Sequence, residues 1–187
     1  MNPYCFDINI PVLHPLRDPN ILDQTGEETQ IWFVKNTDVS TQFVNWLDNN
    51  NLILTYPPLV FYTPPQGECG IHIDGSEIVD RVTMNWAIQN AGANMHWYKL
   101  KAGSTITSQE FTQANTPYTQ YKSEQVLHVH TQPIAWPSIA QVGIPHRITN
   151  HVDAPRWAIS CDISLKSAPT QGLTIEQAKE IFKQWIS

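Results

Sequence analysis

The chain has 187 residues, 41% of them hydrophobic, which is enough for one domain with a core of its own. Its formal net charge is -6, from 11 basic and 17 acidic residues, and no stretch concentrates Lys and Arg, which argues against a nucleic-acid partner. No apolar run reaches the ~20 residues that span a bilayer, no signal-peptide pattern opens the chain, and three isolated cysteines argue against a disulfide framework, so we expect a cytoplasmic protein without a membrane segment.

Residues 1–65 are expected to supply supporting elements around a later core. Only 15% of all residues are charged and 14 prolines divide the chain, a composition that suits short strands and many loops. Residues 8–10 fit an edge strand, and the bulky run at 31–34 predicts a core strand. Two more strands are predicted at 52–56 and 59–62, on either side of a Pro-Pro pair.

A supporting helix is predicted between these strands, in the N-terminal third of the chain. Thr37 or Asp38 can cap it, and the Asn run at 49–51 is a plausible end because Asn tolerates the left-handed conformation. Its apolar face has helical spacing and consists of Val39, Phe43, Trp46 and Leu47.

Residues 66–166 are predicted to be a core made almost entirely of strands. A loop at 90–94 joins two of them, and the polar stretch at 103–125 is our candidate lid, because long polar stretches in a compact domain are usually binding loops. The strands that follow the 70–75 segment are predicted at 82–89, 95–100, 126–130, 139–142, 146–149 and 156–165.

A second helix is predicted at residues 173–187. Thr174 and Gln177 fit a capping box, and Leu173 with Ala178 fits a hydrophobic staple. We expect this helix to dock on the outside of a sheet through an apolar stripe of Ala178, Ile181, Phe182, Trp185 and Ile186.

This order of elements predicts a mainly β fold in one domain, residues 1–187. Eight or so short strands after a helical start favour a double-sheet jelly roll or barrel, with one supporting helix near the N-terminal third and one at the C-terminus. Such a fold can hold a metal ion in its mouth, with ligands from opposing strands.

The stretch Gly70-Ile-His-Ile-Asp-Gly75 carries the strongest chemical signal. On a strand, His72 and Asp74 point to the same face, and an imidazole beside a carboxylate is half of a facial site for a divalent transition metal. The missing ligand is expected to be a His on another strand, and His146 is the best candidate.

His72-x-Asp74, the distal His146 and a basic residue ten positions later, Arg156, together resemble the iron(II)- and 2-oxoglutarate-dependent oxygenases, of the prolyl-hydroxylase-like kind. The resemblance covers residues 70–165 and implies a double-stranded β-helix, the jelly-roll or cupin-like fold. It also implies that His72, Asp74 and His146 bind Fe(II), that 2-oxoglutarate and dioxygen are cosubstrates, and that the enzyme is a dioxygenase that hydroxylates a C–H bond.

The far carboxylate of 2-oxoglutarate needs a fixed cationic partner, and Arg156 suits it because a guanidinium matches a carboxylate with two parallel hydrogen bonds. Arg147 adjoins His146, so on a strand it would face away from the metal. The resemblance makes Asn85 a further candidate near the cosubstrate, and Tyr98 could hydrogen-bond the same carboxylate.

Two other function classes stay open. A cupin-like metalloenzyme without 2-oxoglutarate would use His128 and His130 with His146, although the acidic ligand expected soon after such a His pair is missing. A non-catalytic jelly-roll binding module would not consume 2-oxoglutarate. The acidic, aromatic-rich composition favours a small-molecule or peptide substrate, and the sequence leaves substrate identity and oligomeric state open.

Overall fold

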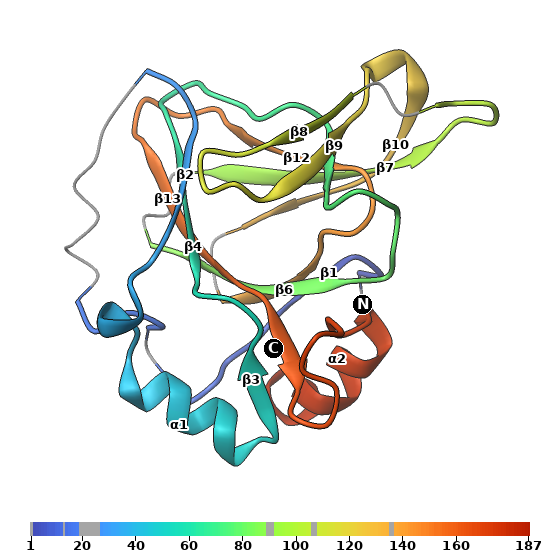
Figure 1. Ribbon diagram of the computed structural model, residues 1–187. Coiled ribbons are helices and arrows are strands. Elements are labelled where there is room, and N and C mark those ends of the chain that lie inside the picture. The colour runs from blue at the N-terminus through green and yellow to red at the C-terminus, as the bar shows by residue number, and fades with distance from the viewer. Residues whose placement is uncertain (1, 13, 19–26, 89–91, 106–107, 135–136) are drawn as a thin grey trace.

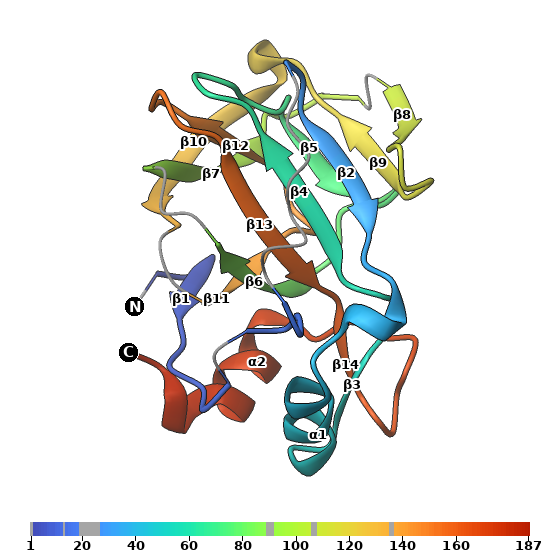
Figure 2. The same ribbon diagram turned by 90° about the vertical axis from the view of Figure 1, so that its left-hand side faces the viewer.

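The short apolar runs of the sequence fold into two six-stranded antiparallel sheets that face each other (Figures 1 and 2). The computed structural model describes residues 2–12, 14–18, 27–88, 92–105, 108–134 and 137–187. The first sheet contains, in spatial order, β1 (Cys5–Asp7), β11 (Ser138–Gln141), β6 (Val82–Ala87), β13 (Arg156–Cys161), β4 (Leu59–Thr63) and β2 (Gln30–Phe33). The second contains β10 (Val126–Pro133), β7 (Ala93–Leu100), β12 (His146–Asn150), β5 (His72–Asp74), β9 (Pro117–Gln120) and β8 (Ser108–Phe111).

The pairing of the strands is nested, which identifies the fold as a jelly roll. β4 pairs with β13, β5 with β12, β6 with β11 and β7 with β10, so the first strand of the core pairs with the last and the innermost two pair with each other. Successive strands from β4 to β7 lie in alternate sheets. The predicted mainly β, double-stranded β-helix fold with two helices is confirmed.

The largest core lies between the first sheet and the two helices, which both cover its outer face (Figure 1). α1 spans Thr41–Asn49 and α2 spans Ile175–Phe182, with short 3-10 helices at Asn36–Asp38, Ser123–Gln125 and Lys183–Trp185. Phe43 of α1 and Phe182 of α2 are fully buried in this core. Packing the helices on the outside leaves the space between the sheets available for a site.

Both predicted helices form, and one predicted cap is wrong. Ser40, not Thr37 or Asp38, accepts a hydrogen bond from the Phe43 N–H, because the two earlier residues form a separate 3-10 turn. The capping box of Thr174 and Gln177 at the start of α2 is confirmed, and α2 docks on the outside of the first sheet as predicted.

Several predicted strand boundaries move. The N-terminal edge strand is β1, three residues earlier than predicted, and the strand predicted at 156–165 divides at Asp162 into β13 and β14 (Ile163–Leu165). β14 leaves the first sheet to pair with β3 (Leu52–Leu54) in a separate two-stranded sheet. Residue 89, the predicted end of one strand, and residues 90 and 91 of the predicted loop lie outside the described residues.

The candidate lid at 103–125 contains regular structure. Within its described part, β8 and β9 form a hairpin that extends the second sheet beyond β5; residues 106 and 107 lie outside the described residues. The prediction of a polar loop is therefore wrong for 108–111 and 117–120, because strands with exposed side chains do not need an apolar pattern.

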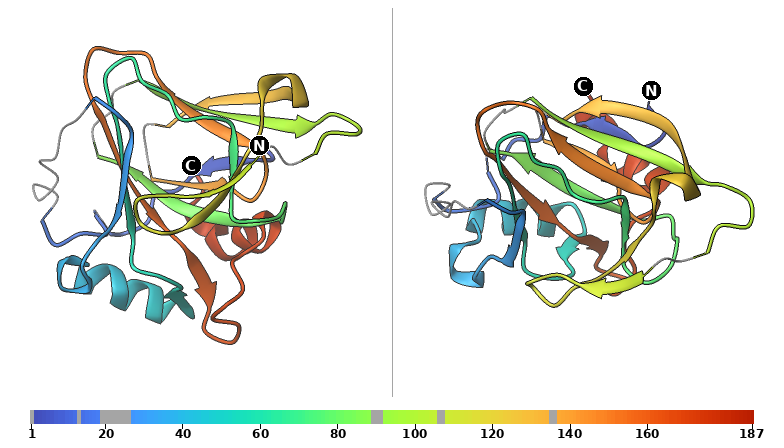
Figure 3. Two further views of the ribbon diagram at one scale, coloured as in Figure 1. Left: turned by 45° about the horizontal axis from the view of Figure 1, so that its top comes forward. Right: turned by 90° about the horizontal axis from the view of Figure 1, so that it is seen from above.

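The two ends of the chain run side by side (Figure 3). Ile8 and Ile186 form an antiparallel bridge, the Asn9 N–H donates to the Trp185 carbonyl, and the Ser187 N–H donates to the Asp7 carbonyl. Among the described residues, neither helix has the length and the apolar character needed to cross a membrane.

Candidate metal centre

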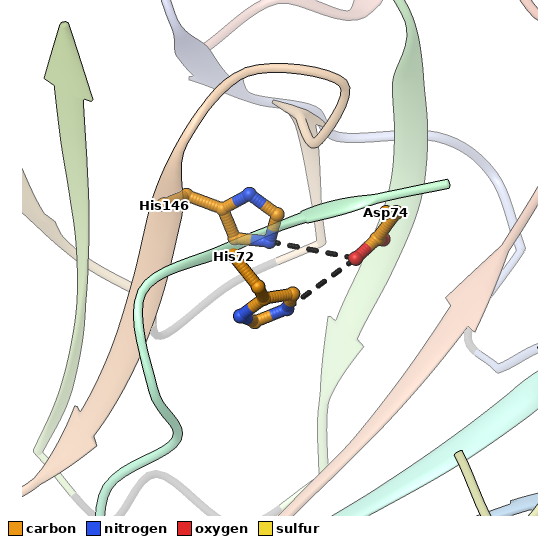
Figure 4. Close-up of side chains that lie close together, drawn as sticks. All are labelled: His72, Asp74 and His146. Atoms are coloured by element: carbon orange, nitrogen blue, oxygen red, sulfur yellow. Dashed lines mark ion pairs between the residues drawn. The ribbon is translucent and has the colours of Figure 1, made fainter. Parts of the chain in front are cut away.

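Two neighbouring strands of the second sheet bring the three predicted metal ligands together. β5 turns His72 and Asp74 toward the first sheet, while Ile73 between them is fully buried on the opposite face. His146 is the first residue of β12 and lies directly opposite His72 in the antiparallel pair. Two residues from one strand and one from its neighbour therefore converge at one point (Figure 4).

The donor atoms of these residues are close enough for one ion. The His72 Nε2 lies 3.4 Å from the Asp74 Oδ1, the His146 Nε2 lies 3.8 Å from the same oxygen, and the ring centroids of the two histidines are 4.4 Å apart. All three donor atoms lie within 4.8 Å of one another, and among the described residues this is the only such group of three or more His, Cys, Asp or Glu.

Backbone carbonyls orient both imidazoles. The His72 Nδ1 lies 2.7 Å from the Gly70 carbonyl, and the His146 Nδ1 lies 2.9 Å from the Ile144 carbonyl. If each Nδ1–H donates to its carbonyl, each Nε2 keeps its lone pair toward the centre, which is how protein sites prepare histidines for a metal. The donor set, two imidazoles and one carboxylate, fits a divalent transition metal such as Fe(II) or Mn(II).

The charges and burial of the cluster lower the pKa values of Asp74 and His146, which favours the protonation states that bind a cation. Burial alone would raise the pKa of Asp74, but the His72 hydrogen bond and the nearby His146 and Arg81 lower it to about 2. Burial, together with the neighbouring His72, lowers the pKa of His146 to about 4. Asp74 is thus ionised and His146 neutral near pH 7.

His72 has the opposite tendency in the metal-free chain. Burial favours its neutral form, but hydrogen bonds with Asp74 and with the Cys69 thiol raise its pKa well above the ordinary value. A divalent cation bound at this point would replace that positive charge.

Two cavities meet at His72 and Asp74. An inner cavity of about 70 Å³ is lined by these two, by His146 and by Arg156, Asn85 and other residues of both sheets. An outer cleft of about 930 Å³ opens from His72 and Asp74 to the surface, between β2–β4 on one side and the β8–β9 hairpin on the other.

Arg156 occupies the inner cavity from the first sheet. It begins β13 opposite Thr63 of β4, and only 4% of its surface is exposed. Its Nε has no hydrogen-bond partner within the described residues, none of which forms an ion pair with it, and burial lowers its pKa to about 10. A buried guanidinium without an anionic partner is costly unless a ligand supplies the anion.

Asn85 and Tyr98, the other two predicted cosubstrate residues, lie on different faces. Asn85 lines the inner cavity, where its Nδ2 donates to the Thr83 Oγ1 at 2.9 Å. Tyr98 points away from the cavity into a small apolar cluster on the outer face of the second sheet, with Ile73 and Tyr121. Its neighbour Trp97 takes the inward position on β7, so Tyr98 is not placed beside the cavity.

The His128 and His130 pair does not join His146. Both lie on β10, which is separated from β12 by β7. The His128 Nε2 contacts the Thr131 Oγ1 at 2.7 Å, and His130 packs beside the rings of Tyr4 and Trp97. The structure therefore does not assemble the ligand set that was predicted for the cupin-like alternative.

Sequence reasoning missed the contacts of two residues beside the cluster. The Arg81 Nη2 donates to the Asp74 carbonyl at 2.6 Å, and the Cys69 thiol hydrogen-bonds His72. Both lie in loops, for which the sequence carries no periodic signal. Arg147, as predicted, faces away from the centre and pairs with Glu68 at 3.3 Å.

Comparisons with known proteins give no family assignment. No family model and no curated protein matches this chain. Among solved structures, the chain is similar to oxalate decarboxylase of Lactobacillus farciminis in a formate complex, with 11% identity over 74% of this chain and 30% of that chain, and a TM-score of 0.34. It is also similar to Bacillus subtilis oxalate decarboxylase, described with Mn(II) centres, with 10% identity over 75% of this chain and 26% of that chain, and a TM-score of 0.34. The chain thus spans less than a third of these proteins, and the fold assignment depends on its own strand order.

Proposed function

We propose that this chain is an iron(II)- and 2-oxoglutarate-dependent dioxygenase that hydroxylates a C–H bond. One observation carries the proposal: the buried Arg156, which forms no ion pair with any described residue, shares a cavity with the His72, Asp74 and His146 cluster. A facial set of two imidazoles and one carboxylate leaves adjacent coordination positions open for a chelating ligand. Because Arg156 and the cluster line the same cavity, a ligand with two separate carboxylates suits it, and 2-oxoglutarate has a carboxylate at each end.

The protein's own residues have distinct parts in this proposal. His72, Asp74 and His146 hold the metal, which supplies redox chemistry with dioxygen when it is bound. Arg156 binds the far carboxylate of 2-oxoglutarate through two parallel hydrogen bonds, a geometry that a lysine cannot reproduce. Since Arg156 is 4% exposed, this ion pair would form almost out of contact with water, where charge attraction is strong.

Polar side chains of the first sheet complete the walls of the inner cavity. Asn85 and Ser160 face it from neighbouring strands, β6 and β13, and lie opposite each other in their register. They offer hydrogen bonds to a polar ligand beside the apolar lining residues Met95 and Val142. This arrangement suits a small dicarboxylate better than a purely apolar ligand.

A second candidate is a jelly-roll metalloenzyme, cupin-like in fold, that does not use 2-oxoglutarate. The compact group of three donors favours it independently, because such a group can bind a divalent metal without any help from Arg156. In that case Arg156 would bind an anionic substrate directly.

Anaerobic titration of Fe(II)-loaded protein with 2-oxoglutarate distinguishes these candidates. We expect a weak visible charge-transfer band in the wild type, loss of the band in Arg156→Ala with Fe(II) binding retained, and loss of Fe(II) binding in Asp74→Ala. Fe(II) binding without any band at saturating 2-oxoglutarate would favour the second candidate. No specific metal binding would leave a non-catalytic binding module.

A further inference from the structure

The free edge of β2 borders the outer cleft, and its backbone groups are available to a partner. β2 pairs with β4 on one side, and in the part of the chain that the structure describes no strand pairs with its other side (Figure 2). Strand backbones present N–H and C=O groups to alternate sides, so Ile31 and Phe33 direct theirs to the open edge. An edge of this kind is a template for another extended chain.

One side chain already occupies part of that edge. Gln113, at the tip of the β8–β9 hairpin, accepts a hydrogen bond from the Ile31 N–H at 3.1 Å and donates one to the Thr29 carbonyl at 3.4 Å. Its carboxamide thereby occupies the Ile31 N–H and the Thr29 carbonyl, which the C=O and N–H groups of an added strand would otherwise pair with. Gln113 is exposed, so a peptide can displace it at little cost.

The edge lies close to the metal cluster. Ile31 of β2 and Phe61, its partner on β4, line both the outer cleft and the inner cavity, as His72 and Asp74 do. A chain laid along β2 would therefore pass the open side of the metal site with a side chain directed toward it.

The walls of the cleft are aromatic and acidic. Phe33, Tyr56 and Phe111 are the aromatic members of the exposed large hydrophobic residues in the described chain, with 38%, 58% and 63% of their surfaces exposed, and all three line this cleft. Such a concentration of exposed aromatic surface marks an interaction site.

The acidic residues of the cleft outnumber the basic ones. Glu27 and Glu28 are exposed there and form no ion pair with any described residue. Arg81 is the only Lys or Arg among the described lining residues, and its Nη2 donates to the Asp74 carbonyl. Carboxylates beside aromatic faces favour the side chain of Lys or Arg, through charge attraction and cation–π contact.

We propose that the outer cleft binds an extended peptide segment carrying a Lys or Arg side chain, which adds to the free edge of β2 in place of the Gln113 carboxamide. The binding of this peptide does not depend on the proposed function. The further statement that the peptide is the substrate of the dioxygenase does rest on it. Backbone pairing with β2 would supply general affinity for polypeptide, and the aromatic, acidic wall would supply the preference for basic residues.

The test uses fluorescently labelled peptide pools of about eight residues, a length within the usual range of strands. The pools have degenerate sequences around one fixed central residue, Lys in one pool and Glu in the other. Binding to the full chain is followed by anisotropy, with and without Mn(II) and 2-oxoglutarate. We expect the Lys pool to bind about threefold to tenfold more tightly, an advantage that falls with added salt, and backbone N-methylation to abolish binding.

Two variants separate this proposal from a merely acidic surface. Gln113→Ala removes the competing carboxamide and should strengthen binding about threefold to tenfold. The double variant Glu27→Gln/Glu28→Gln should lose the preference for Lys, whereas the control Glu176→Gln/Glu180→Gln, on α2, should keep it.

Three outcomes would overturn the proposal: no binding of either pool, equal binding of both pools, or no gain in affinity in Gln113→Ala. Dimerisation of Gln113→Ala in sedimentation would also overturn it, since the edge would then take a second copy of this chain. Peptide binding without the charge-transfer band would support peptide binding in the outer cleft and count against the dioxygenase. The band without peptide binding would support the dioxygenase and overturn the proposal for the cleft.

Discussion

His72 and His146, 74 positions apart in the sequence, lie directly opposite each other in the β5–β12 pair, with ring centroids 4.4 Å apart. The nested pairing of the jelly roll creates this contact, because the second core strand must pair with the second-last. The strand order therefore creates the metal site. A change in the register of the β5–β12 pair would separate the two histidines.

Removal of one ligand tests this centre most directly. Asp74→Ala should weaken the binding of Mn(II) or Fe(II) by about 100-fold or more, since even the residues that support metal ligands contribute 10–100-fold. His96→Ala is the matched control: His96 lies on the same sheet, but its ring nitrogens contact Thr131 and Thr149. Equal metal binding by both variants, measured by calorimetry, would rule out the assigned ligands.

The proposed role of Arg156 in binding 2-oxoglutarate has a cost: the buried charge should lower the stability of the ligand-free protein. Arg156→Met removes a buried charge that forms no ion pair with any described residue, so we expect a melting temperature about 2–4 °C higher than that of the wild type, which corresponds to about 1 kcal/mol. The same variant should no longer be stabilised by 2-oxoglutarate in the presence of Mn(II), although it still binds the metal. If Arg156→Met melted at a lower temperature than the wild type both without ligands and with Mn(II) and 2-oxoglutarate, Arg156 would have a structural role instead.

The spacing of residues along a strand predicts which side chains face the metal site on β5 but not on β7. The i, i+2 spacing places His72 and Asp74 on one face of any strand, and the order of His146 and Arg156 agrees with the nested topology. On β7 the same argument fails, because Met95, Trp97 and Tyr98 are all buried and both faces are apolar. The alternation of side chains along the strand then does not decide whether Trp97 or Tyr98 faces the cavity.

Two further features could not be read from the sequence for a different reason. The β8–β9 hairpin is exposed and polar, so its strands lack the hydrophobic alternation that marks half-buried strands. The β-bulge between His128 and His130 breaks the i, i+2 rule that would put both side chains on one face. Both features depend on tertiary contacts.

Thiol labelling should separate the three cysteines. Cys69 lines both cavities and should react with a disulfide reagent at pH 8, whereas Cys5 and Cys161 are buried. Burial raises the pKa of Cys5 from 9.0 to about 12, so its thiolate is suppressed below that pH and its labelling in the native state should remain slow up to pH 10. One thiol per native chain and three after denaturation is the expected count. Rapid labelling of a second thiol at pH 8 would contradict the burial of Cys5 or Cys161.

Gly143 tests whether the turn before His146 is as tightly packed as the site requires. A Cβ added at Gly143 would lie 2.2 Å from the Val79 carbonyl oxygen, a backbone atom that cannot move without shifting its segment. The Val79 N–H also donates to the Gly143 carbonyl, so the two backbones are held together. Gly143→Ala should therefore destabilise the fold by about 2–3 kcal/mol in urea unfolding, in the upper range for single substitutions.

Gly70→Ala is the matched control, because a Cβ there would meet no atom within 4 Å and the residue lies two positions before β5, in the other ligand-bearing segment. It should change the unfolding free energy by less than about 0.5 kcal/mol. Gly143→Ala should also weaken metal binding, since His146 follows the displaced turn by three residues, whereas Gly70→Ala should leave it unchanged. Similar unfolding curves for the two variants would show that the segment around Val79 shifts easily, and the position of His146 would then depend on its strand pairing with His72 and Trp97.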